Sequence, residues 1–158
     1  MSDAASPALR AVLGGMEPAG GWTDFSSFVE VNVLVDRLFG SGDLGLVREL
    51  GRDAARRTAG VWRSLFEKGV DVPKFVEIAG GLWHKHYDVG SIERSIVAAD
   101  RVKVEIRGMP EPHRAHCLAV AGWIEGVFEF KPGVHVVANE LSCRASGEAT
   151  CEMMLHWS

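Results

Sequence analysis

The chain has 158 residues, of which 47% are hydrophobic and 24% charged, and its formal net charge is −4. This length suits one domain, and the composition suits a globular protein that buries a core. The mildly acidic balance and the lack of a basic run argue against direct binding of nucleic acid. No stretch reaches the roughly 20 apolar residues of a membrane span. Residues 1–15 lack the cationic start of a secretory signal, so we expect a cytoplasmic protein.

The first 21 residues are rich in Ala, Gly, Ser and Pro. We expect residues 1–21 to form a flexible or loosely helical lead-in, followed by a single domain over residues 22–158. From Thr23, apolar residues recur at three- and four-residue steps, which predicts a helix that ends at Gly40.

Two further helices and two strands are predicted next. Apolar periodicity predicts one long helix from Asp43 to Gly69 and a third helix that Asp71 caps. The pattern then changes to a two-residue period, which is typical of strands. We expect strands over Ile92–Ala98 and Val102–Ile106.

The C-terminal part predicts one more helix and a hairpin. The helix spans about His113–Phe128, and the strands span Val134–Leu141 and Thr150–Trp157. The order is helices, two strands, a helix and two strands. It indicates an α+β fold in which N-terminal helices pack on a twisted antiparallel sheet.

The three cysteines of the chain lie in this last part. Cys117 falls near the start of the predicted helix, Cys143 follows the first hairpin strand, and Cys151 begins the second. Glu140 and Cys143 lie at the end of one predicted strand and Cys151 at the start of the next, and a hairpin brings those ends together across its turn. Zinc takes four such ligands in structural sites. The spacing alone leaves two other interpretations open, because cysteines also pack as apolar residues and Cys143 could form a disulfide with Cys151.

The same segment resembles a known family. It is similar to the 4-vinyl reductase domain and to the effector-sensing domains of phenol- and xylene-responsive transcription activators. The resemblance rests on a cysteine before a Gly-x-x-x-Gly helix, a Glu-x-x-Cys, a small-Gly turn and a last cysteine. These are Cys117, Gly122, Gly126, Glu140, Cys143, Gly147 and Cys151.

The resemblance implies a structural zinc ion on Cys117, Glu140, Cys143 and Cys151. His113 and His116 are alternatives to Glu140, because imidazole also binds zinc. The resemblance also implies a small-molecule-sensing or ligand-binding domain that acts on a separate effector protein. A homodimer is expected, because the apolar stripes over residues 23–69 are wider than one sheet face needs.

The wider fold group contains vesicle-tethering TRAPP subunits and haem-dependent nitric-oxide sensors. The tethering subunits imply the alternative function, a non-enzymatic dimeric scaffold for protein interaction. A haem site is disfavoured, because the Tyr-x-Ser-x-Arg clamp of the nitric-oxide sensors is absent from the sequence.

A hydrophobic or aromatic ligand would need an apolar pocket between the helices and the sheet. Aromatic residues at helical spacing can line such a pocket, although they more often form plain core. His84 and Tyr87 are candidate polar anchors beside them. The candidate ligand-binding residues are Trp62, Phe66, Trp83, His84, Tyr87 and Trp123.

No catalytic motif is found. The sequence has no recognisable Ser-His-Asp triad pattern, no phosphate-binding glycine loop and no dinucleotide-binding motif. A zinc ion with four protein ligands has no open position for water. We therefore expect that the protein is not an enzyme.

Overall fold

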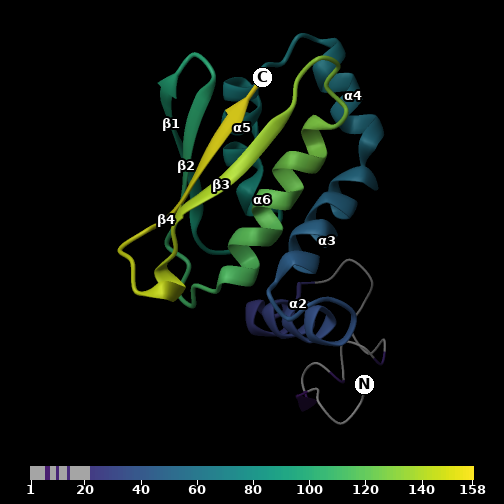
Figure 1. Cartoon of the computed structure of the whole chain (residues 1–158), viewed down its shortest axis with the longest axis vertical. Helices are drawn as coiled ribbons and strands as arrows, with labels where there is room; N and C mark the ends of the chain where they lie inside the picture. The colour runs from purple at the N-terminus through teal and green to yellow at the C-terminus, as the bar shows by residue number, and fades with distance from the viewer. Residues whose placement is uncertain (1–5, 8–9, 11–13, 15–21) are drawn as a thin grey trace.

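The structure is a computed structural model that describes residues 6, 7, 10, 14 and 22–158 (Figure 1). Apart from those single positions, the predicted lead-in over residues 1–21 lies outside the described residues. Within the described residues, no helix is both long enough and apolar enough to cross a membrane.

The described domain combines helices with one four-stranded sheet, which confirms the predicted α+β class. The helices are α2 (Phe25–Phe39), α3 (Gly45–Arg56), α4 (Ala59–Glu67), α5 (Val72–Leu82) and α6 (Arg114–Phe128). The strands are β1 (Ser91–Ala98), β2 (Arg101–Arg107), β3 (Val136–Ser142) and β4 (Cys151–Trp157). Short 3-10 helices are η2 (Trp83–Lys85) and η3 (Arg144–Ser146).

The sheet is antiparallel throughout, with the strand order β1-β2-β4-β3. Val102, Val104 and Ile106 alternate with polar residues along β2 and are fully buried, as their two-residue period predicts. Ile106 pairs with Cys151 of β4. Because paired residues of antiparallel strands share a face, Cys151 lies on the face of the sheet that carries the core.

Figure 1 shows the helices in two layers on one side of the sheet. α6 packs against β3 and α5 against β1, while α3 lies along the outer side of α6. α2 crosses the lower end of these helices in the view of Figure 1. α6 is therefore enclosed from several sides, and most of its residues are buried.

Glycines allow α3 and α6 to approach each other closely. A Cβ atom on Gly122 would collide with the carbonyl of Arg48, and one on Gly126 would lie 2.8 Å from the Cα atom of Arg52. Gly51 faces α6 in the same way, at the carbonyl of Ala119. The Gly-x-x-x-Gly pattern of the sequence is thus a helix-packing motif here.

The prediction of one long helix over Asp43–Gly69 is wrong. The helix is interrupted at Arg57 and Thr58, between α3 and α4. The indole N–H of Trp62 donates a hydrogen bond to the Ala55 carbonyl over 3.0 Å, so this carbonyl has a side-chain partner at the break. The break turns Trp62 inward, where its side chain is only 7% exposed.

Candidate functional site

The three cysteines meet at one end of the sheet. Cys117 lies in the first turn of α6, Cys143 follows β3, and Cys151 is the first residue of β4. Their Sγ atoms all lie within 4.8 Å of one another. Each residue is at most 5% exposed, and all three are free thiols. The three cysteines are therefore close enough to bind a metal ion, as the spacing in the sequence indicated.

The turn between β3 and β4 brings Cys143 and Cys151 together. The backbone N–H of Ser146 donates to the carbonyl of Cys143 over 2.9 Å, which closes η3. Gly147 then takes a left-handed conformation, with φ of 90°, that suits glycine. The backbone N–H of Arg144 lies 3.4 Å from the Sγ atom of Cys151 and donates to it. Such a contact stabilises negative charge on sulfur.

Burial makes charged thiolates costly in this cluster unless a cation is bound. Burial raises the pKa of Cys117, and the nearby thiols of Cys151 and Cys143 raise it further. Burial also raises the pKa of Cys143. Without a cation the thiols of Cys117 and Cys143 therefore keep their protons at neutral pH, and a metal ion would have to displace these protons. Tetrahedral zinc would hold its sulfur ligands about 3.8 Å apart, so the cluster needs only a small contraction to bind it.

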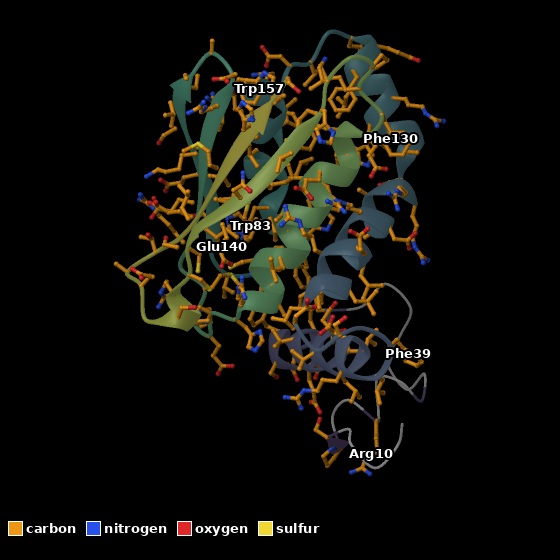
Figure 2. All side chains as sticks on the ribbon, in the orientation of Figure 1. Arg10, Phe39, Trp83, Phe130, Glu140 and Trp157 are labelled. Atoms are coloured by element: carbon orange, nitrogen blue, oxygen red, sulfur yellow. The ribbon has the colours of Figure 1, made fainter. Side chains whose placement is uncertain are left out.

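Glu140 lies beside the cluster, near the end of β3 that leads into η3 (Figure 2). Its carboxylate accepts a hydrogen bond from Nε of Arg114 over 3.0 Å and is not one of the three grouped metal-binding side chains. With Cys117 and Cys151, Glu140 lines a small hollow of about 10 Å³. That volume suits one water molecule or one ion.

His113 and His116 differ sharply in their surroundings. His113 is the N-cap of α6, and its Nδ1 accepts a hydrogen bond from the N–H of Ala115. His116 is only 2% exposed, and its Nε2 atom has no hydrogen-bond partner among the described residues. Burial lowers the pKa of His116 to about 4, so the ring is neutral at physiological pH. An unsatisfied buried polar atom costs about 1–3 kcal/mol.

Aromatic rings surround His116 on several sides. Their centroids lie between 5.1 and 6.3 Å from that of the imidazole. We call this group the His116 cluster. It consists of His116, Phe25, Phe28, Trp83 and Tyr87. The burial of His116 is not indicated by the sequence, because the periodicity of α6 places its neighbour Cys117 on the core face and says nothing of a second buried face.

The six candidate ligand-binding residues fall into separate groups. Trp62 packs edge-on against Trp123 with their centroids 5.3 Å apart, and Phe66 joins them through the ring of Phe75. Trp83 and Tyr87 stack on each other at 4.3 Å in the His116 cluster. The ring contacts thus form two groups within one hydrophobic core rather than the wall of a single cavity.

His84, the sixth candidate, is exposed on η2. None of the six lines the small hollow beside the cysteines. None lines a larger groove of about 540 Å³ between α2 and the segment before α6. Their part in ligand binding stays a prediction.

Comparisons with known proteins show similarity in structure. No family model and no curated protein sequence matches the chain. An H-NOX protein from S. oneidensis, solved in its Fe(II) ligation state, is similar with a TM-score of 0.66 at 13% identity, over 96% of this chain and 86% of that one. The phenol-responsive sensory domain of the transcription activator PoxR, solved with phenol, gives 0.59 at 14% identity, over 83% and 73%.

A tethering subunit is also similar. Subunit 3 of the trafficking protein particle complex from Naegleria fowleri, covalently bound to palmitic acid, has a TM-score of 0.53 at 11% identity. The match covers 83% of this chain and 92% of that one. The predicted resemblance to phenol-sensing domains, haem-dependent sensors and tethering subunits is confirmed at the level of the fold. At these identities the chain shares the fold of these proteins, and its function has to be argued from its own site.

Proposed function

We propose that this protein is a non-enzymatic, small-molecule-sensing domain that is stabilised by one structural zinc ion and acts on a separate effector protein. The observation that carries the zinc proposal is the meeting of Cys117, Cys143 and Cys151 within 4.8 Å in a buried position. Thiolates are the ligands that structural zinc prefers.

Glu140 is proposed as the fourth ligand. It lines the same small hollow as two of the cysteines, and a rotation of its side chain away from Arg114 would bring the carboxylate to the ion. Bound zinc would join α6 to the β3–β4 hairpin. Because four protein ligands leave no open position for water, the ion would supply stability rather than catalysis.

The sensing proposal draws support from the neighbours in fold. The sensory domain of PoxR is phenol-responsive and was solved with phenol, and the H-NOX protein was solved in its Fe(II) ligation state. In this chain, α6 carries both Cys117 and His116, so one helix connects the metal cluster to a buried aromatic environment. A ligand there could change the position of α6 and so signal to a partner.

Haem does not fit the described residues well. The hollow beside the cysteines, at about 10 Å³, is far too small for a porphyrin, and the residues that line the larger groove of about 540 Å³ include neither a cysteine nor His116. His116, the buried imidazole, is packed among aromatic rings. We therefore derive no role for haem in this chain.

Metal analysis tests the zinc proposal. Protein purified without chelating resin should carry one zinc ion per chain by elemental analysis. Cys151→Ser should lose the ion and lower the melting temperature, because metal binding couples to folding. Ser146→Ala, an exposed change in the same turn, is the matched control and should keep the ion. Wild-type protein that contains no zinc, and whose melting temperature does not change when zinc is added or removed, would refute the proposal.

A thermal-shift screen tests the sensing proposal. A ligand that binds only the folded state at a hundredfold excess over its Kd stabilises it by about 2.7 kcal/mol. Phenols, short fatty acids and tetrapyrroles should include at least one class that raises the melting temperature. Trp83→Ala should abolish that shift and leave the zinc in place. A screen in which no class gives a shift would count against sensing.

The alternative function is a scaffold for protein interaction. It is favoured by the packed interior, in which Trp62, Phe66 and Trp123 belong to one core cluster or pack against it. Exposed apolar side chains on the helices, such as Phe39 at 69% exposure, could then meet a partner. A negative ligand screen together with a stable protein complex would select this alternative.

A further inference from the structure

Two of the three cysteines border a hollow that reaches toward the surface. Cys117 and Cys151 line the hollow of about 10 Å³, and Cys143 does not. Arg48 and Glu140 also line it, and their side chains are 28% and 26% exposed. A hollow of this volume holds one water molecule. Hydrogen peroxide is only slightly larger than water, so small movements of these two side chains would admit it to the cysteines.

Cys151 is the cysteine that is best placed to react with such a molecule. The backbone N–H of Arg144 donates a hydrogen bond to its Sγ atom over 3.4 Å. Cysteine attacks a peroxide as the thiolate, and a hydrogen-bond donor at the sulfur stabilises the negative charge. Among the described residues, Cys151 alone of the two cysteines at the hollow accepts a backbone N–H.

Cys143 is the cysteine that can then close on Cys151. The three Sγ atoms lie within 4.8 Å of one another, whereas a disulfide holds its two sulfur atoms about 2.0 Å apart, so one cysteine has to move. Cys143 and Cys151 flank a turn in which residues 145–149 are all exposed. Cys117 lies in α6, most of whose residues are buried. The exposed turn can therefore adjust more easily than the helix.

We propose that a hydroperoxide oxidises Cys151 and Cys143 to a disulfide, with Cys151 as the attacking thiol, and that Cys117 stays free. This inference goes beyond the proposed zinc site, because it assigns a reaction to the metal-free cysteines and does not require that zinc binds. The disulfide would remove two of the thiolates that a metal ion needs.

The reaction has two balanced steps. The Cys151 thiolate attacks one peroxide oxygen, the S–O bond forms as the O–O bond breaks, and the leaving oxygen takes up a proton. Cys151 is then a sulfenic acid, and its sulfur has lost two electrons to the peroxide. Cys143 gives up its proton and attacks this sulfur, and the leaving hydroxide takes up that proton. With hydrogen peroxide, two thiols thus give one disulfide and two water molecules.

Mass spectrometry of the wild-type chain tests the proposal without a variant that has to fold. After treatment with a chelator, hydrogen peroxide should remove two hydrogen atoms per chain. Peptide mapping should link Cys143 to Cys151 and find Cys117 free. A link to Cys117, a link between two chains, or three free thiols under conditions that oxidise glutathione would overturn the proposal.

Variants of the pair identify the attacking thiol. In Cys143→Ser the sulfenic acid has no partner, so the trapping reagent dimedone should label Cys151. In Cys151→Ser both remaining cysteines should stay thiols over the same time. Dimedone on Cys117 in the first variant, or oxidation of the second at the wild-type rate, would contradict the role of Cys151.

The hydrogen bond to Cys151 can be removed by one substitution. Arg144→Pro lacks the N–H, and Arg144→Ala is the matched control that keeps it. Arg144 begins η3, where proline is tolerated, and Cys143 is already extended, as a residue before proline has to be. Disulfide formation should be about three- to tenfold slower in Arg144→Pro than in Arg144→Ala, as one hydrogen bond implies. Equal rates would contradict the activation of Cys151.

Zinc content separates this inference from the zinc proposal. Protein that carries zinc should release the ion as the disulfide forms. If the protein binds zinc and its metal-free form makes no disulfide, this inference fails and the zinc proposal stands. If the disulfide forms in protein that never binds zinc, this inference stands and the zinc proposal fails.

Discussion

Nε of Arg48 on α3 donates a hydrogen bond to the carboxylate of Glu125 on α6 over 3.0 Å. Glu125 is only 6% exposed, and it also accepts from Nη2 of Arg52 over 2.7 Å and from the backbone N–H of Ala138 over 2.8 Å. One buried carboxylate therefore joins α3, α6 and β3. It lies beside the glycine contacts through which α3 and α6 approach each other.

Glu125→Gln should destabilise the protein strongly. The change leaves two guanidinium groups without their shared carboxylate, and breaking a buried ion pair costs about 3–5 kcal/mol. The arginine side chains are 28–29% exposed, which favours the lower end, about 3 kcal/mol. Chemical denaturation measures this loss of unfolding free energy. Glu129→Gln, one turn later in an exposed pair with Arg56, is the control and should change stability little.

The same carboxylate should make stability depend on pH. Burial alone would raise the pKa of Glu125, but the hydrogen bonds from Arg48, Ala138 and Arg52 outweigh it and lower the pKa below 4.5. A lowered folded-state pKa contributes stability that is complete above the unfolded-state pKa and is lost as the pH falls through the folded-state pKa. The difference in unfolding free energy between wild type and Glu125→Gln should stay constant above about pH 5.5 and narrow in more acidic solution. A difference that widens on acidification would contradict this assignment.

Gly122→Ala should destabilise the protein although alanine favours helices. The new Cβ atom would collide with the Arg48 carbonyl and push α3 away from α6. Overpacking of this kind costs about 1–3 kcal/mol. Gly81→Ala on α5 is the matched control, because a Cβ atom there meets nothing within 4 Å. Thermal unfolding should show a gain for Gly81→Ala of up to about 1 kcal/mol and a loss for Gly122→Ala.

The sequence predicted the elements that depend on local patterns. The alternation of Val102, Val104 and Ile106 identified β2, and Asp71 caps α5 by accepting a hydrogen bond from the N–H of Lys74. The break between α3 and α4 was missed, because it depends on the indole of Trp62 and on burial in the tertiary structure. Apolar periodicity continues across the break and cannot indicate it.

The candidate site was likewise predicted only in part from the sequence. Cysteine spacing and hairpin geometry predicted the meeting of Cys117, Cys143 and Cys151. The pairing of Glu140 with Arg114 joins a strand to a helix 26 residues away, and no local pattern indicates it. His116 is buried because α2 packs over the start of α6, and contacts between helices cannot be predicted from one helix alone.

The predicted homodimer has a candidate surface on the N-terminal helices. Leu38 and Phe39 of α2 and Val61 of α4 are 47%, 69% and 55% exposed, and Phe39 projects away from the sheet in Figure 2. Light scattering at micromolar concentration should give twice the chain mass, and Phe39→Glu should give the monomer. Ile96→Glu, at a similarly exposed residue of β1, is the control and should leave the dimer intact. A monomeric wild-type protein would contradict the prediction.

The proposed fourth zinc ligand can be identified by a pair of variants. Glu140→Gln should lower zinc affinity at least about tenfold, because the amide is a poor zinc ligand and carries no charge. Arg114→Gln should have the opposite effect and raise the affinity about two- to fivefold, because it removes the partially exposed guanidinium that competes for the carboxylate. Competition against a zinc-binding dye measures both changes.

Variants of the two histidines at the start of α6 test whether an imidazole, rather than Glu140, is the fourth zinc ligand. If His113→Asn or His116→Phe lowered zinc affinity and Glu140→Gln did not, an imidazole would be the fourth ligand. The structure favours Glu140, because it lines the hollow with Cys117 and Cys151, whereas Nδ1 of His113 already accepts the N–H of Ala115. His116 in turn lies among aromatic rings of the His116 cluster. Opposite changes in affinity for Glu140→Gln and Arg114→Gln are expected only if the ion and Arg114 compete for one carboxylate.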